Sequence, residues 1–160
     1  DDTDLEQRPR LGIAVTVCRD LQPFAQTLGL IPRVVTAGIG CKRGTSDEKI
    51  AEAVSRAAAQ AGISLRAIAG VASIDLKKDE PGLVAYCRGR GFPFETFSAE
   101  ELRAVEGQFT PSSFVSSVTG VDNVCERSAV RASGGQLIAG KMAREGVTVA
   151  FAVRTWRPVF

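Results

Sequence analysis

The sequence predicts an α/β fold with three layers, α/β/α, and a mixed sheet that ends in a C-terminal β-hairpin. Strand patterns alternate with helix patterns along the 160 residues, which is typical of a sheet packed between helices. The run "AIAGVASIDL" (67–76) is almost entirely apolar, as in a strand covered on both faces. Near the end, "QLIAGKMA" and "VTVAFAVRTW" flank "REG", which predicts an antiparallel hairpin, although "LIAGKMA" also fits a helix.

The first part of the chain is interpreted as a tail, a strand and a helix. Residues 1–10 are polar and are expected to form an N-terminal tail, with a single domain over residues 11–160. The segment "LGIAVTV" (11–17) is apolar and β-branched, which predicts a buried strand. The segment "RDLQPFAQTLG" (19–29) has helical spacing, and Gly29 is a plausible stop.

A second strand and helix follow around a glycine-rich loop. The segment "RVVTAGIG" (33–40) predicts a short strand that runs into this loop. Thr45 and Glu48 fit a capping box, in which the threonine side chain begins the helix. Gly62 is expected to end that helix, since glycine readily adopts the left-handed conformation of a C-cap.

The middle and later elements are placed by proline, by capping residues and by apolar runs. Pro81 stands near the first turn of a helix, and "PFETF" (93–97) predicts a short strand. Ser98 and Glu101 fit a further capping box. Two short helices are expected in "PSSFVSSV" and "NVCERSAVRAS", separated by "TGVDN".

Composition excludes several classes of function. The net charge of +2 is too small to indicate nucleic-acid binding, and there is no apolar run long enough to span a membrane. The chain has no histidine, and its four cysteines are scattered, which disfavours zinc sites and Ser-His or Cys-His nucleophile pairs. We therefore expect no metal and no cofactor. Scattered cysteines without a secretion signal favour reduced thiols and a cytoplasmic location.

The loop "GIGCKRGTS" is a candidate anion site. Its glycines allow sharp turns that expose N–H groups, and the following helix adds its partial positive end to the lysine and arginine charges. The spacing is neither the Walker A pattern nor G-x-G-x-x-G. The alternative is a tight turn with a solvated basic pair. The candidate ligand-binding residues are Gly38, Gly40, Cys41, Lys42, Arg43, Gly44 and Thr45.

The loop "SIDLKKDE" (73–80) is a second candidate, because mixed charges follow directly after a buried strand. Asp75 ends that strand and is a candidate catalytic carboxylate. Lys77, Lys78 and Glu80 are candidate ligand-binding residues. The alternative is an ordinary helix N-terminus, whose acidic residues complement the helix dipole.

The loop "TGVDNVCERSA" (119–129) supplies the third candidate. Asp122 is a good N-cap for a helix that contains Glu126, and the two carboxylates are four residues apart, so they could share a face and do acid–base chemistry. Capping and a helix-surface ion pair are the plainer alternative. Asn123 and Arg127 are the candidate ligand-binding residues of this loop.

Taken together, these loops resemble those of one family. "GIGCKRGTS", "SIDLKKDE", "PFETFSAEEL" and "TGVDNVCERSA", followed by "GVTVAFA", look like the cobalamin biosynthesis protein CobE and the C-terminal domain of CbiG. The resemblance runs in order from about residue 11 to residue 153. It implies a role in building the corrin ring of vitamin B12, with other enzymes of that pathway as candidate partners.

The two branches of the family imply different activities. CbiG resembles a hydrolase that opens a lactone on cobalt-precorrin-5A and releases acetaldehyde. Full CbiG chains carry a further N-terminal part, and a chain of the present size looks more like CobE. CobE implies involvement in corrin synthesis, without a settled reaction.

The resemblance also suggests which anion the basic loops hold. Corrin precursors carry many acetate and propionate carboxylates. Lys42, Arg43, Lys77 and Lys78 would bind several carboxylates through charge-assisted hydrogen bonds. The expected ligand is therefore a tetrapyrrole polycarboxylate, with no nucleic acid or membrane partner.

Three hypotheses of function remain open at this point. The first is a protein that binds a corrin intermediate or helps to process it. The second is a hydrolase of the ring lactone, with Asp75, Asp122 or Glu126 as general base. The third is a phosphate- or nucleotide-binding module that uses the glycine loop.

Overall fold

The main sheet is mixed, as the sequence predicts. The computed structural model describes residues 9–111, 120–157 and 159. Five strands lie in the order β5-β4-β3-β7-β6. β3, β4 and β5 are parallel, whereas β7 is antiparallel to both β3 and β6. The strands are β3 (Val35–Cys41), β4 (Ile68–Ile74), β5 (Phe94–Phe97), β6 (Gln136–Arg144) and β7 (Val147–Val153).

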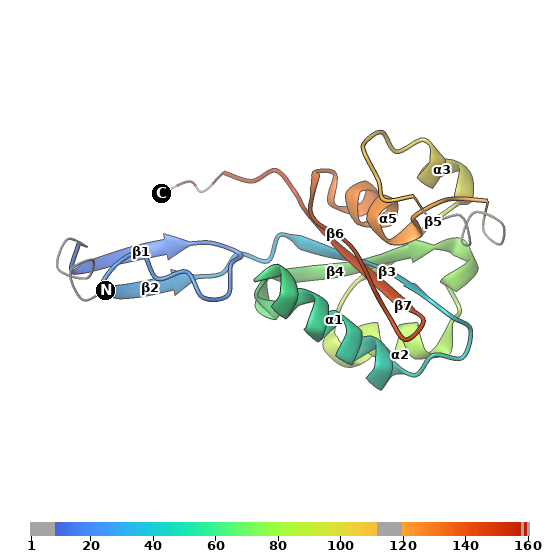
Figure 1. The fold of residues 1–160 in the computed structure, drawn as a ribbon, viewed down its shortest axis with the longest axis horizontal. Coiled ribbons are helices and arrows are strands. Elements are labelled where there is room, and N and C mark those ends of the chain that lie inside the picture. The colour runs from blue at the N-terminus through green and yellow to red at the C-terminus, as the bar shows by residue number, and fades with distance from the viewer. Residues whose placement is uncertain (1–8, 112–119, 158, 160) are drawn as a thin grey trace.

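Helices cover both faces of this sheet, which confirms the three-layer α/β/α fold (Figure 1). On one face, Val35, Ala37 and Ile39 of β3 pack into a core shared with α1 and α2. On the other face, α5 lies so close to β3 that a Cβ on Gly38 would overlap the carbonyl oxygen of Cys125. The helices are α1 (Asp47–Ala61), α2 (Pro81–Arg90), α3 (Ala99–Arg103) and α5 (Val124–Ser133).

The C-terminal hairpin is present, and the helical alternative for "LIAGKMA" is wrong. β6 pairs with β7 through an antiparallel ladder that runs from Gln136↔Val153 to Arg144↔Val147. The turn between them has Glu145 and Gly146 at positive φ, the conformation that a tight two-residue hairpin requires.

Two predicted helix caps are displaced by one residue. Ser46, not Thr45, caps α1, because its side chain accepts the N–H of Lys49, while the Thr45 hydroxyl donates to the carbonyl of Lys42 instead. Asn123, and not Asp122, caps α5. In both cases two adjacent residues are competent caps, and local pattern does not choose between them.

Other local predictions are confirmed. Gly62 ends α1 in the left-handed conformation, and Pro81 stands in the first turn of α2. Ser98 and Glu101 form both hydrogen bonds of the capping box at α3. The helix expected in "PSSFVSSV" falls almost wholly outside the described residues.

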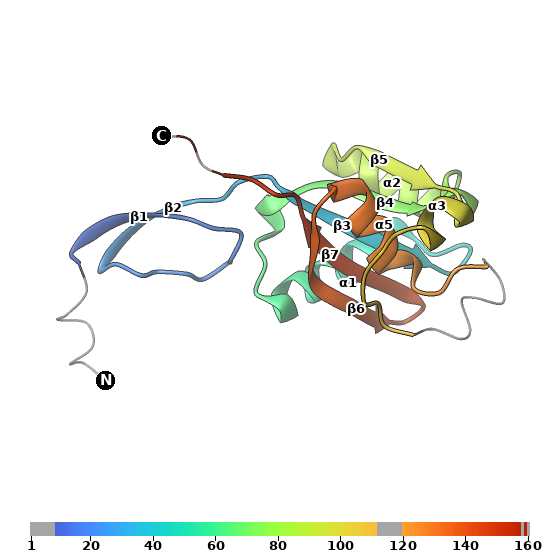
Figure 2. The ribbon, with the colours of Figure 1, turned by 90° about the horizontal axis from the view of Figure 1, so that it is seen from above.

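The segment from residue 11 to residue 30 differs most from expectation. The predicted helix over 19–29 is wrong: its end belongs to β2 (Gln26–Leu30), which pairs in parallel with β1 (Leu11–Val15) in a separate two-stranded sheet. The strand at β1 is correct, but its predicted burial is wrong, since Leu11 and Ile13 are exposed. Both views show this pair of strands, here called the arm, extending away from the main sheet (Figures 1 and 2).

The base of the arm is fixed to the main body. Ser64 N–H donates to the carbonyl of Val17 at 2.8 Å, and Arg19 N–H donates to the carbonyl of Gly62 at the same distance. Val17 and Ile31 pack against the core between the sheet and α1. The arm therefore leaves the body beside the α1–β4 connection. Among the described helices, none is long and apolar enough to cross a membrane.

Candidate functional site

The glycine loop and the loop after β4 meet at the carboxyl edge of the parallel strands. The carboxylate of Glu80 is buried and accepts the N–H of Gly44 at 2.7 Å. Its other oxygen lies 3.4 Å from Nζ of Lys77. Gly44 has φ +78°, a left-handed conformation that turns its N–H toward Glu80. The two loops, which are far apart in the sequence, are thus joined by one carboxylate.

One further close approach tightens this junction, and Cys41 lies near it. A Cβ on Gly82 would overlap the carbonyl oxygen of Thr45, so the start of α2 lies directly against the glycine loop. Cys41 ends β3 beside the Lys77–Glu80 pair. Burial raises the pKa of the Cys41 thiol, and the charge of Lys77 only partly opposes that change. Cys41 is therefore held as a neutral thiol at physiological pH, and not as a nucleophilic thiolate.

The cations of the two loops differ in exposure. Lys42 and Arg43 are exposed, although the stem of Lys42 lies over Gly146 in the β6–β7 turn and its N–H donates to the carbonyl of Gly146. Lys78 is exposed and Lys77 is partly buried by its contact with Glu80. The glycine loop therefore already binds one anion that belongs to the protein itself, the carboxylate of Glu80. Arg43 and Lys78 are exposed cations that an anion from outside the protein can reach.

The third loop lies at the same edge but on the α5 face of the sheet. α5 packs on β3 through Cys125 and Gly38, and Ser128 Oγ donates to the carbonyl of Ala72 on β4. The helix then leads to Gln136, which pairs with Val153 at the opposite edge. The N-terminus of α5, with its cap Asn123, is consequently at the carboxyl edge of the parallel strands.

Glu126 is a buried carboxylate that ties three segments together. It is only 1 % exposed. One oxygen accepts the Thr110 hydroxyl at 2.8 Å and the N–H of Lys141 on β6 at 2.6 Å, and the other accepts the N–H of Thr110 at 2.9 Å. Asn123 completes the cluster by donating from Nδ2 to the carbonyl of Thr110 at 2.7 Å. These contacts give Glu126 a positioning role between α5, β6 and the segment around Thr110.

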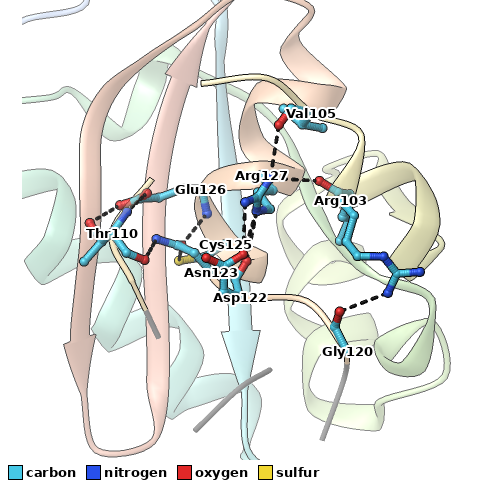
Figure 3. Close-up of polar contacts among 10 residues, drawn as sticks. Arg103, Val105, Thr110, Gly120, Asp122, Asn123, Cys125, Glu126 and Arg127 are labelled. Atoms are coloured by element: carbon cyan, nitrogen blue, oxygen red, sulfur yellow. Dashed lines mark hydrogen bonds and ion pairs between the residues drawn. The ribbon is translucent and has the colours of Figure 1, made fainter. Parts of the chain in front are cut away.

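Arg127 extends to the opposite side of α5 (Figure 3). It forms an ion pair with Asp122 at 2.9 Å and donates to the carbonyl of Val105 at 3.0 Å. Its guanidinium also lies over the ring of Phe109, 4.5 Å from the centroid. The Asp122 and Glu126 carboxylates, which the sequence suggested as a pair, therefore hold different partners on different sides of the helix.

The remaining candidates divide between packing and exposure. Gly38 lies against α5, and a Cβ on Gly40 would crowd the hydroxyl of Thr148 on β7. Both glycines therefore allow β3 to pack closely against a neighbouring element. Asp75 is exposed in a short 3-10 helix directly after β4. Thr110 was not singled out in the sequence, because no local pattern links it to Glu126, 16 residues away.

A hollow among the described residues lies at the other edge of the sheet. It has a volume of about 160 Å³ and is bordered by the starts of β3, β4 and β5 and the end of α5. Arg154 and Glu95 are its charged residues. None of the predicted ligand-binding residues lines it.

Comparison with known proteins shows to which family this chain belongs. The profile of the family described as "Cobalamin synthesis G C-terminus" matches residues 35–152, from the start of β3 almost to the end of β7. The chain belongs to this family. The resemblance seen in the sequence motifs is thereby confirmed.

Relatives of the family are of two lengths. The chain is 35 % identical over 153 residues to the cobalt-precorrin-5A hydrolase of Salmonella typhimurium, a match that covers 94 % of the chain and 44 % of that protein. It is 31 % identical over 118 residues to the protein CobE of a Sinorhizobium species, covering 72 % of the chain and 77 % of CobE. The chain thus spans less than half the length of the hydrolase.

A solved structure of CobE, described as a protein from the cobalamin (vitamin B12) biosynthetic pathway, has the same fold. Its TM-score is 0.70 at 32 % identity, and the match covers 78 % of this chain and 93 % of CobE.

Proposed function

We propose that this protein acts in cobalamin biosynthesis by binding a corrin-ring intermediate at the carboxyl edge of β3, β4 and β5. The observation that carries the proposal is the family match over residues 35–152, which spans nearly the whole main sheet together with all three candidate loops. Other enzymes of the same pathway are the proposed macromolecular partners, because a bound intermediate has to be passed on.

The charges of the edge support a polycarboxylate ligand. Arg43 and Lys78 are exposed, and the Glu80 contact fixes the loops that carry them. Cations on a loop whose backbone is already held lose less conformational freedom on binding than cations on a free loop, which favours recognition of several carboxylates at once. The same contact weakens the phosphate or nucleotide alternative, since the N–H of Gly44 already has a carboxylate partner.

Binding can be tested with a tetrapyrrole polycarboxylate and its methyl ester. We expect the free acid to bind more tightly at low salt, and the difference to shrink at 1 M salt, where the screening length falls to about 3 Å. Arg43→Ala should weaken binding of the acid at least about tenfold, since a charge-assisted hydrogen bond contributes about 1.5–3 kcal/mol. Arg66→Ala is the matched control, because Arg66 is also exposed but lies at the opposite edge of the sheet. Equal affinity for acid and ester at low salt would contradict the proposal.

Hydrolysis of a ring lactone is a second candidate function. It is favoured by the 35 % identity to a protein named cobalt-precorrin-5A hydrolase. Asp75 is the proposed general base, because it is exposed and follows β4 directly, whereas Glu126 is buried and Asp122 is paired with Arg127. It would take a proton from water as the oxygen adds to the lactone carbonyl, and the ring C–O bond would then break to leave an alcohol and a carboxylate. Mass analysis decides between the two functions. An unchanged mass of the bound ring supports the first, and a mass change that matches lactone opening, with or without loss of acetaldehyde, and that is abolished in Asp75→Asn supports the second.

A further inference from the structure

The arm has one apolar face that is open to solvent. In the parallel register Leu11 pairs with Gln26, Ile13 with Leu28 and Val15 with Leu30, so these six side chains share a face. Five of the six are aliphatic. Leu11 is 73 % exposed, Ile13 58 %, Leu28 57 % and Leu30 46 %. The opposite face carries small or polar residues, and there the ring of Phe24 lies against Gly12.

Such a face is unusual for a parallel pair of strands. Parallel strands in proteins are almost always covered on both faces, and a pair of strands alone in water is marginally stable at best. The hydrogen bonds at the base of the arm hold its direction, but the figures show the strands themselves reaching beyond the helices of the main body (Figures 1 and 2). The arm therefore has the features of a surface that another polypeptide segment covers.

The extents of the matches indicate which polypeptide this is. The part of the chain left outside the hydrolase match is shorter than the arm, so that match includes most of the arm. The part left outside the CobE structure is longer than the arm, although the match covers 93 % of CobE. The family profile begins at residue 35, after the arm. The arm therefore goes with the longer type of relative, of which 56 % lies outside the match.

We propose that the aliphatic face formed by Leu11, Ile13, Val15, Leu28 and Leu30 docks against the polypeptide that corresponds to this additional part of the hydrolase. The contact is apolar, with packing on the aliphatic face. The open edges of β1 and β2 supply further backbone hydrogen-bond donors and acceptors for the same partner. The surface is separate from the candidate corrin-binding edge, so it does not depend on the function proposed above.

A chimaera tests the proposal. In it, this chain replaces the matched part of the Salmonella typhimurium hydrolase, and hydrogen–deuterium exchange of residues 11–15 and 26–30 is compared with that of the chain alone. We expect exchange to slow at least tenfold in the chimaera and to return toward the free rate in the double variant Ile13→Lys, Leu28→Lys. Ile138→Lys is the control, since Ile138 is a partly exposed aliphatic residue on β6 in the main sheet. Unchanged exchange in a folded chimaera would overturn the proposal.

Two further measurements cover the other outcomes. If the chimaera does not fold, the additional part of the hydrolase is co-expressed with this chain as a separate polypeptide. Co-purification in equal amounts, lost in the double variant but not in Ile138→Lys, supports docking; an insoluble or unbound partner counts against it. Sedimentation of the chain alone tests a second copy as the occupant, and a dimer that the double variant dissociates would replace the proposed partner.

Discussion

The carboxylate of Glu80 accepts the N–H of Gly44 at 2.7 Å, across 36 residues of sequence. Because Glu80 is buried and also contacts Lys77, this bond fixes the relative position of the glycine loop and the start of α2. The loop that looked most like an external anion site is thus organised around an anion of the protein itself.

Replacing Glu80 should therefore destabilise the fold as well as the candidate site. Glu80→Ala leaves the N–H of Gly44 without its partner, and hydrogen bonds to charged groups contribute about 1.5–3 kcal/mol. We expect the free energy of unfolding, measured with urea, to fall by about 2 kcal/mol. Asp79→Ala, at the exposed neighbouring position, should change it by no more than about 0.5 kcal/mol. Equal effects of the two variants would show that the Glu80 contact adds no stability.

Glu126 offers a test that separates positioning from catalysis. Glu126→Ala removes the acceptor of three donors, from Thr110 and Lys141, and should lower the free energy of unfolding by about 3 kcal/mol or more. Glu126→Gln keeps one oxygen acceptor and should cost less. If Glu126→Gln retained full stability but abolished conversion of a corrin substrate, Glu126 would be a catalytic base and the positioning role would be secondary.

The start of α1 gives a comparison between adjacent residues. Ser46→Ala should cost about 1 kcal/mol, because it removes the side chain that accepts the N–H of Lys49. Thr45→Ala removes only the bond from its hydroxyl to the carbonyl of Lys42 and should cost about 0.5 kcal/mol. Thermal or urea unfolding of the two variants checks this order. A larger loss in Thr45→Ala would assign the cap to Thr45 after all.

The cysteines should differ in how readily they are alkylated. Burial raises the pKa of Cys87 and of Cys125 to about 12, whereas Cys18 is exposed. Since the thiolate is the reactive form, Cys18 should react with iodoacetamide first at pH 8, and Cys87 and Cys125 should stay unmodified in the folded protein. Mass mapping after timed alkylation checks this. Early labelling of Cys125 would mean that α5 opens from the sheet.

The same two thiols affect stability at high pH. Their pKa is 9.0 when unperturbed and higher in the folded state, so between pH 9 and about 12 the unfolded chain holds fewer protons than the folded one. Their contribution is thus fully present below pH 9 and is lost as the pH rises through that range. Cys87→Ala should flatten this decline, which unfolding measurements from pH 8 to pH 11 would reveal.

The ends of several helices around the main sheet could be predicted, because the residues that mark them act locally. Gly62, and the pair Ser98 and Glu101, mark element ends through hydrogen bonds within a few residues of sequence. The strand β1 was predicted, but β2 and its parallel pairing with β1 were not, because residues 19–29, which include most of β2, repeat at helical spacing.

The candidate site was predicted as a set of loops but not as a set of contacts. The two basic loops do lie together, yet the bond from Gly44 to Glu80 and those from Thr110 and Lys141 to Glu126 are long-range. In the sequence, the residues around a carboxylate that becomes buried do not differ from those around a carboxylate that stays exposed. The division of labour between Glu126 and Arg127 on two sides of α5 therefore became visible only in the structure.

The place of β3 in the sheet also has a consequence for synthesis. β3 lies between β4, which follows it by about one helix, and β7, which comes after all the other described helices and strands in the sequence. One side of β3 therefore stays unpaired on the ribosome until Val147–Val153 has emerged, and an open strand edge is prone to pair with other chains. Such long-range pairing also slows folding. Nascent chains stalled before β7 should consequently be the species that most needs a chaperone.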